Sequence, residues 1–246
     1  DEFDHDSTSE PMIIDEVFEG ELRKMIVHVS RNGHVYAMDR ETGDFLWAGE
    51  YTRVNWALRD ESGKPVLKEE LYNPASTVVF PGIFGGKNWP PASYSPDTHM
   101  LYIPTTEWGT TFIRREGEGR PGTMYLGGIP RFEPSGTGYL VAFNMLTGEI
   151  EWQEETPGNF NWAGTLTTGG GLVFSGAADG YLRAYNDETG EVLWEFQTGS
   201  GLYAPPTSFT IDGVQYIGIA SGTRNPVTRA GVATGIAPGN YILFSL

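Results

Sequence analysis

An eleven-residue pattern occurs three times in the chain and constrains its fold more than any other feature. The pattern A-x-[DN]-x-x-T-G-x-x-x-W fills Ala37–Trp47, Ala142–Trp152 and Ala184–Trp194 without gaps. The residues before the acid or amide alternate as in a half-buried strand, and Asp or Asn followed by Thr-Gly indicates a tight turn. The next strand ends on tryptophan, a large anchor with a polar N–H. We therefore predict that each copy is a β-hairpin whose tryptophan docks on a neighbouring unit.

The spacing of the copies predicts an all-β fold made of β-propeller blades. The turn glycines Gly43, Gly148 and Gly190 lie 105 and 42 residues apart, and the shorter interval matches one four-stranded blade of ~40–45 residues. We expect the longer interval to hold one degenerate blade plus insertions at 59–70 and 114–134, which are rich in glycine, proline and charge. This gives about four antiparallel blades, which either close alone or form half of a larger ring.

Helix signals are nearly absent, and we expect residues 1–246 to form a single β-propeller domain or half-propeller. A hairpin is predicted over Ser93–Pro104 and a closing strand over Tyr241–Leu246. Only Glu16–Lys24 has a pattern that suits a short helix.

Composition excludes several classes of function. The formal net charge is −16, which disfavours nucleic acid and anionic lipid as partners. The absence of cysteine excludes disulfides, thiolate metal sites, cysteine nucleophiles and covalently attached c-type haem. No apolar run approaches the ~18 residues of a membrane helix, and no signal-peptide pattern is present. The four histidines are isolated along the chain, so we predict no histidine metal site.

The tryptophan-ended repeat resembles the docking motif of the pyrroloquinoline quinone (PQQ) dependent alcohol dehydrogenases, whose propeller has eight blades. Four more segments resemble that family in the same order along the chain: RNGHVYAMDR at 31–40, GGKNWPP at 85–91, NWAG at 161–164 and DGVQYI at 212–217. The resemblance implies that this chain is the C-terminal half of the propeller. The complementary N-terminal half would supply the other cofactor contacts. It is a partner chain, or the rest of a longer chain of which this is an excerpt, or it is missing because the lineage has lost the activity.

The first residues resemble the D-x-W-D motif of the family, with Phe3 in the place of the tryptophan. The resemblance implies that Asp4 is the catalytic base, which takes the proton of the alcohol hydroxyl. The hydride would pass to C5 of the quinone while a bound metal polarises the C5 carbonyl. Asp4 would also bind this metal, and Asp6 is a second candidate ligand because residues i and i+2 of a strand share a face. Ca²⁺ suits such oxygen ligands, and lanthanide-dependent members carry an extra aspartate at this offset. The alternative for Asp6 is a solvated carboxylate.

Four further residues are implied to bind the cofactor. Arg31 matches the basic residue near the quinone oxygens, where a guanidinium would stabilise the reduced, more anionic form. The alternative is a surface arginine before an Asn-Gly turn. Asn88 and Trp89 match a segment that reaches the cofactor carboxylates, and Trp162 matches a tryptophan that lines the same pocket. A tryptophan of the propeller core is the alternative for Trp162.

The resemblance implies PQQ-dependent oxidation of an alcohol or sugar in the periplasm, with electrons passed to a cytochrome c or a quinone. The alternative is a non-catalytic propeller that serves as a binding scaffold, as in outer-membrane assembly lipoproteins. A scaffold has no need for Asp4, Arg31 and Asn88 together, so their joint presence favours the enzyme.

Overall fold

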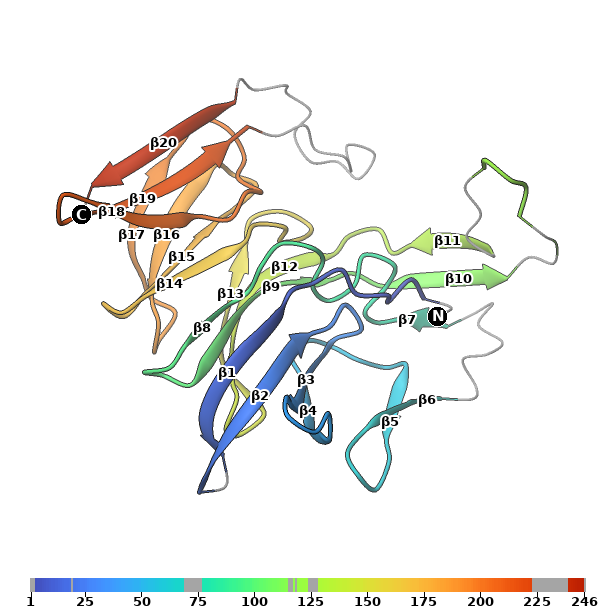
Figure 1. Cartoon of the computed structure of the whole chain (residues 1–246). Coiled ribbons are helices and arrows are strands. Elements are labelled where there is room, and N and C mark those ends of the chain that lie inside the picture. Colours follow the sequence, from blue (N-terminus) through green and yellow to red (C-terminus); the bar gives the residue numbers. More distant parts are fainter. Residues whose placement is uncertain are drawn as a thin grey trace.

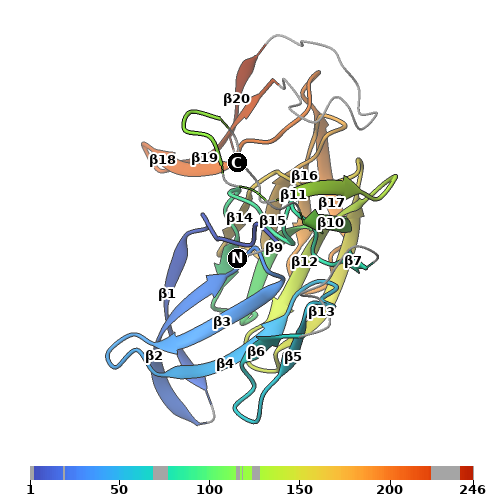
Figure 2. The ribbon, with the colours of Figure 1, turned by 90° about the vertical axis from the view of Figure 1, so that its right-hand side faces the viewer.

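Four antiparallel sheets follow one another along the chain, and we call them blades 1 to 4 (Figures 1 and 2). The computed structural model describes residues 3–18, 20–68, 77–114, 117, 119–123, 128–222 and 239–245. Blade 1 consists of β1 (Pro11–Phe18), β2 (Glu21–Val29), β3 (His34–Asp39) and β4 (Phe45–Glu50). Blade 2 consists of β8 (Ser93–Ser95), β9 (Met100–Glu107), β12 (Thr137–Asn144) and β13 (Glu149–Thr156).

The last two blades use consecutive strands. Blade 3 consists of β14 (Thr165–Thr168), β15 (Leu172–Gly176), β16 (Tyr181–Asn186) and β17 (Val192–Gln197). Blade 4 consists of β18 (Thr207–Ile211), β19 (Val214–Ser221) and β20 (Asn240–Ser245). The all-β prediction is confirmed, as are the hairpin at β8–β9 and the final strand at β20. Within the described ranges, no helix is present that could cross a membrane.

Two smaller elements lie outside the blades. A hairpin joins β5 (Ala57–Arg59) to β6 (Pro65–Leu67), and a three-stranded sheet joins β11 (Gly128–Phe132), β10 (Thr110–Arg114) and β7 (Val78–Val79). They account for much of the predicted insertions. The rest of those insertions, residues 69–70, 115–116, 118 and 124–127, lies outside the described part of the chain.

The prediction of a degenerate blade in the long interval is wrong. The described residues of that interval hold the last strand of blade 1, the two small elements and three strands of blade 2, β8, β9 and β12. The interval is long because β10 and β11 leave blade 2 between β9 and β12 and pair with β7. The total of four holds because β18–β20 form the fourth blade. Glu16–Lys24, the one segment with a pattern that suits a short helix, spans the β1–β2 hairpin, where Phe18 pairs with Glu21.

The predicted turn chemistry is confirmed in all three repeats. The side-chain Oδ1 of the acid or amide accepts two backbone N–H bonds from the next residues. These bonds run at 2.8 and 3.0 Å to Asp39, at 2.8 and 3.2 Å to Asn144, and at 3.0 and 2.9 Å to Asn186. The glycine that follows has φ of 81°, 73° and 76° at Gly43, Gly148 and Gly190, a left-handed conformation that glycine adopts readily.

The first and last residues of the repeat lie directly opposite each other. The register shifts by one residue after the alanine, so the tryptophan pairs with that alanine in each copy: Ala37 with Trp47, Ala142 with Trp152, and Ala184 with Trp194. The small alanine leaves the large indole free to turn toward the next blade.

Each repeat tryptophan docks on the following blade, as predicted. The contacts are Trp47 to Phe143, with ring centroids 6.2 Å apart; Trp152 Nε1 to the carbonyl oxygen of Asp187, at 2.9 Å; and Trp194 to Phe244, with centroids 5.1 Å apart. This regular sequence of contacts links blades 1, 2, 3 and 4 in order.

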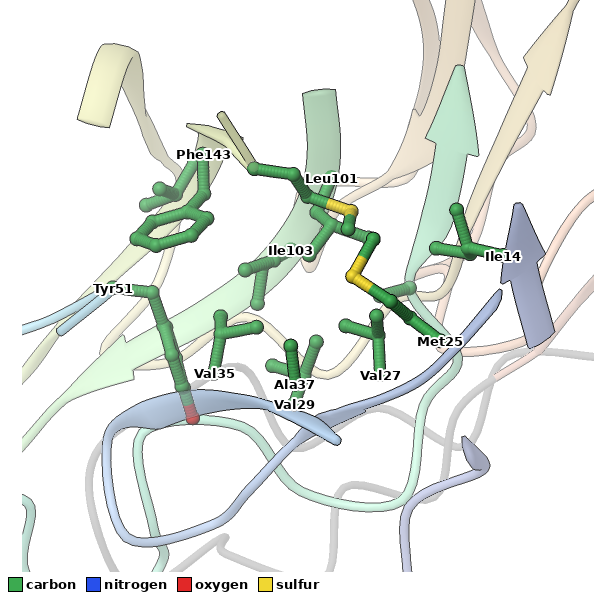
Figure 3. Packing of buried hydrophobic residues seen from close by; sticks show 13 residues of the cluster. Ile14, Met25, Val27, Val29, Val35, Ala37, Tyr51, Leu101, Ile103 and Phe143 are labelled. Carbon is green, nitrogen blue, oxygen red and sulfur yellow. The ribbon is translucent and has the colours of Figure 1, made fainter. Parts of the chain in front are cut away.

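The core lies between the blades. Figure 3 shows the largest cluster, in which Met25 and Val35 of blade 1 meet Leu101 and Phe143 of blade 2. Burial of one such side chain contributes about 1.5–3 kcal/mol. On β12, residues 141 and 143 join this cluster, whereas residues 140 and 142 join the one shared with blade 3. The prediction of a half-buried strand is therefore wrong for β12, because blade 1 covers one of its faces and blade 3 covers the other.

Candidate functional site

The loop between β7 and β8, residues 80–92, gathers the predicted site residues; we call it the site loop. Asn88 and Trp89 belong to it. Arg31, in the turn between β2 and β3, donates from Nη2 to the carbonyl oxygen of Ile83. The amide of Gly86 donates to the carbonyl oxygen of Arg31 at 2.8 Å. The turn that carries Arg31 is thus bonded to the site loop through both its backbone and its side chain.

Asp4 lies next to Arg31. Its Oδ2 is 3.1 Å from Nη2 of Arg31, and the two side chains are 47% and 12% exposed. Arg31 is therefore no free surface arginine. Asp4 has φ of 60°, a left-handed conformation that aspartate and asparagine tolerate better than most residues. An ion pair this exposed contributes at most about 1 kcal/mol to the free energy of folding. Its main effect is to place a negative and a positive charge side by side at the candidate site.

The pKa of Asp4 is raised. Burial raises it most, the positive charge of Arg31 lowers it, and the hydrogen bond and negative charge of Asp6 raise it again. A raised pKa makes a carboxylate a stronger proton acceptor. The interaction between Asp4 and Asp6 also means that the two carboxylates lie close together, as a shared cation would require.

Asp4 and Asp6 are exposed, whereas Phe3 and His5 are buried. Both aspartates therefore lie on the exposed side, but residues 3–10 form no strand, so the strand geometry from which Asp6 was predicted as a ligand is absent. The described residues hold no group of three or more histidine, aspartate or glutamate side chains that could bind a metal. A Ca²⁺ ion takes about six to eight oxygen ligands, so these two carboxylates would supply only part of its shell. Residues 1 and 2 of the resembling motif lie outside the described part.

The Asn88 side chain holds the site loop in shape. Its Nδ2 donates to the carbonyl oxygen of Phe84 at 2.9 Å, and its Oδ1 accepts from the amide of Trp89 at 2.9 Å. Trp89 is 50% exposed. Contact of Asn88 and Trp89 with a cofactor stays a prediction.

Trp162 reaches the site loop through Phe84, with ring centroids 5.9 Å apart. It also packs on Phe160 at 4.8 Å, so it belongs to an aromatic cluster. Its Nε1 is buried and has no acceptor among the described residues, and the same holds for Nε of Arg31. Buried donors are normally satisfied. Two such donors at positions predicted to bind a quinone fit an anionic ligand rich in oxygen acceptors.

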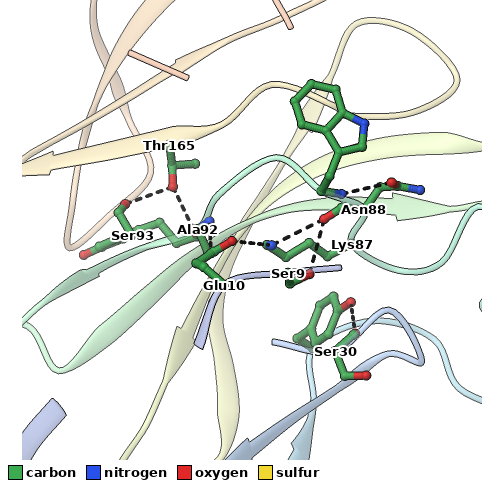
Figure 4. Close-up of polar contacts among 11 residues, drawn as sticks. Ser9, Glu10, Ser30, Lys87, Asn88, Ala92, Ser93 and Thr165 are labelled. Atoms are coloured by element: carbon green, nitrogen blue, oxygen red, sulfur yellow. Dashed lines mark hydrogen bonds and ion pairs between the residues drawn. The ribbon is translucent and has the colours of Figure 1, made fainter. Parts of the chain in front are cut away.

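Residues 3–10 form what we call the N-terminal segment. Lys87 and Glu10 link this segment to the site loop (Figure 4). Lys87 Nζ lies 3.4 Å from Oε2 of Glu10, and Oε1 of Glu10 accepts from the amide of Ala92 at 2.9 Å. The Lys87 side chain is completely buried. Burial lowers the pKa of Lys87, and the charge of Glu10 acts in the opposite direction.

His5 provides another link between the N-terminal segment and the site loop. Its Nε2 lies 2.9 Å from the carbonyl oxygen of Pro81, at the start of the site loop. Burial lowers the pKa of His5 to about 4, so its ring is neutral at pH 7 and can donate one hydrogen to this carbonyl.

The chain is similar to known proteins in both sequence and structure. Residues 124–217 match the family model "Glucose/ethanol/alcohol dehydrogenase, beta-propeller domain". The chain is 34% identical over 182 residues to the quinoprotein ethanol dehydrogenase of Pseudomonas aeruginosa. It is 30% identical over 184 residues to the lanthanide-dependent methanol dehydrogenase of Methylorubrum extorquens. Each match covers 67% of this chain.

The chain belongs to the PQQ-dependent alcohol dehydrogenase family. Its structure is similar to that of a europium-containing methanol dehydrogenase, with a TM-score of 0.88 and 28% identity, over 100% of this chain and 49% of that one. The chain spans 29–30% of the length of the two curated relatives. It therefore corresponds to part of a quinoprotein dehydrogenase.

The sequence patterns do not single out three residues of the candidate site. His5 was interpreted as an ordinary isolated histidine, and Lys87 and Glu10 were not singled out. A signal was present for two of them: His5 lies between Asp4 and Asp6, and Lys87 lies inside the GGKNW segment. Nothing in the sequence marks Glu10, because its partner is 77 residues away.

Proposed function

We propose that this chain supplies the catalytic base and part of the cofactor site of a PQQ-dependent dehydrogenase that oxidises an alcohol or sugar. One observation carries the proposal. Asp4 lies 3.1 Å from Arg31, with Asp6 on the same exposed side, and Arg31 is bonded to the loop that holds Asn88 and Trp89. Family membership supports the kind of reaction.

Asp4 acts on the substrate proton. Its carboxylate accepts the hydroxyl hydrogen of the alcohol, which leaves a carbonyl product once the carbon has lost its hydride. When bound, PQQ supplies the acceptor for that hydride, and the metal polarises the acceptor carbonyl. Arg31 pairs with the Asp4 carboxylate and keeps a positive charge where negative charge develops.

The chain offers donors and oxygens to both groups. Nε of Arg31 and Nε1 of Trp162, which lack acceptors among the described residues, would bind quinone or carboxylate oxygens of PQQ, beside Asn88 and Trp89. The oxygens of Asp4 and Asp6 would bind Ca²⁺ or a lanthanide ion. The second carboxylate favours the more highly charged lanthanide.

Two further partners are proposed: the other half of the propeller and an electron acceptor. The chain covers 49% of the europium-containing enzyme, so a complementary N-terminal half would complete the ring and the metal shell. Electrons would leave to a cytochrome c or a quinone, and the protein would work in the periplasm.

The decisive test is Asp4→Asn in the complete dehydrogenase, loaded with PQQ and either Ca²⁺ or La³⁺. Asparagine tolerates the left-handed backbone at position 4 but cannot accept the proton, so dye-linked alcohol oxidation should fall about 10²–10⁴-fold. The matched control is Asp212→Asn, since Asp212 is an exposed aspartate with φ of 50° in the β18–β19 turn.

Turnover of Asp4→Asn close to that of Asp212→Asn would remove Asp4 from its role as base. If the unmodified protein neither binds PQQ nor turns over with either metal, the dehydrogenase proposal is wrong. The scaffold function then becomes the better reading of this propeller.

A further inference from the structure

We propose that His5 is a positioning residue that holds the carboxylates of Asp4 and Asp6 beside Arg31. This inference rests on the proposed function, in which those two carboxylates meet the substrate and the metal. His5 contacts neither group; it acts through the backbone on either side of its own ring.

The ring of His5 is fixed by its surroundings. The residue is 9% exposed, and its Nε2 lies 2.9 Å from the Pro81 carbonyl oxygen. Its ring centroid is 5.6 Å from that of Phe3 and 5.9 Å from that of Trp56. A buried ring that packs against two other rings and is hydrogen-bonded at Nε2 cannot turn without breaking these contacts.

Phe3, which is 4% exposed and packs on Phe112 with ring centroids 5.4 Å apart, anchors the segment on the N-terminal side of Asp4. The remaining anchors lie farther from the carboxylates. Ser9 Oγ donates to the carbonyl oxygen of Asn88 at 3.4 Å, and Glu10 bonds Lys87 and Ala92 of the site loop. These contacts fix residues 9 and 10, whereas His5 is the anchor between the two aspartates. Asp4 itself has the half-exposed ion pair with Arg31, which is too weak to fix a backbone alone.

Loss of the His5 hydrogen bond should therefore free residues 4 to 6 while the fold persists. His5→Phe keeps a buried ring but cannot donate to Pro81. His5→Gln places an amide donor at nearly the position of Nε2 and should restore the bond. His34→Phe is the matched control, because His34 packs on the same Trp56 and its ring nitrogens have no hydrogen-bond partner among the described residues.

The first measurement is the backbone ¹⁵N relaxation of Asp4 and Asp6 in the full chain, which needs no ligand. We expect order parameters near 0.85 in the unmodified chain, His5→Gln and His34→Phe, and below about 0.6 in His5→Phe. Equal order parameters in His5→Phe and the unmodified chain would overturn the proposal. So would failure of His5→Gln to restore them.

The second measurement is tryptophan-sensitised luminescence of Tb³⁺ added alone. His5→Phe should raise the terbium Kd about tenfold, as loss of a residue that orients metal ligands does, with His5→Gln and His34→Phe unchanged. An unmodified chain that binds no terbium, or binds it equally well as Asp6→Asn, would argue against the metal site of the proposed function. The relaxation data would still decide the role of His5.

Discussion

Gly85 packs so closely on Arg31 that a Cβ atom at position 85 would lie 2.7 Å from Cγ of Arg31 and 3.0 Å from its carbonyl oxygen. Gly85 also has φ of 75°, which disfavours any other residue. This approach brings the site loop against the turn that carries Arg31, so the geometry of the candidate site depends on a glycine at this position.

Gly85→Ala should therefore displace Arg31. Gly63 has φ of 82° and open space around its Cβ position, so Gly63→Ala measures the backbone cost alone, about 1–2 kcal/mol. The contact with Arg31 should add about 1–3 kcal/mol in Gly85→Ala. Urea unfolding measures both variants, and equal losses would mean that the loop shifts without strain.

The docking tryptophans should differ in their hydrogen-bond contribution. Trp152 Nε1 donates to the Asp187 carbonyl oxygen at 2.9 Å, whereas Trp47 Nε1 is buried with no partner among the described residues. Trp152→Phe should lose about 1 kcal/mol more stability than Trp47→Phe, since both lose similar apolar area but one loses a hydrogen bond. Urea unfolding again gives the comparison, and a larger loss for Trp47→Phe would contradict it.

Glu16 should make the interface of blades 1 and 2 sensitive to acid. Burial raises its pKa, but hydrogen bonds from the Tyr94 hydroxyl, His99 Nδ1 at 2.8 Å and the Val17 amide at 2.8 Å lower it, and the net shift is downward. Because the folded pKa lies below its ordinary value of 4.5, this stability is present above about pH 4.5. It is lost as the pH falls through the folded pKa.

Glu16→Gln should cost about 2 kcal/mol near pH 7, and this difference should shrink toward pH 3. Thermal unfolding across this range measures it, with the exposed Glu61→Gln as control. A cost for Glu16→Gln that is the same at both ends of the range would exclude a charged Glu16 as the cause.

His34 should make the protein lose stability over a pH range that begins above the range in which Glu16 acts. Burial, with a smaller effect from the charge of Arg59, lowers the pKa of His34 from 6.5 to about 4. Between these values the unfolded chain binds a proton that the folded chain does not, so stability falls by up to about 3 kcal/mol as the pH drops. His34→Phe should remove this loss. The test is the melting temperature at about pH 7 and pH 4.5, where an unchanged difference in the variant would contradict the prediction.

The sequence predicted the features that depend on neighbouring residues. The turns at Asp39, Asn144 and Asn186 form because the side chain bonds amides two and three residues ahead, so the eleven-residue repeat contains the whole interaction. The repeat also predicted that tryptophan docks between units. The resemblance to the dehydrogenase family placed Asp4 and Arg31 in one site, and the structure brings them together.

The sequence alone determined the all-β class, the hairpins, the docking residues and the family. Only the tertiary structure decided that β10 and β11 branch out of blade 2, and that Asp4, Arg31 and Trp162 converge on one loop. It also decided that His5 and Lys87 tie the N-terminal segment to that loop. The physical reason is distance along the chain: His5 and Pro81 are 76 residues apart, and no local pattern of hydrophobicity or turn residues specifies which of many distant carbonyls a buried donor will meet.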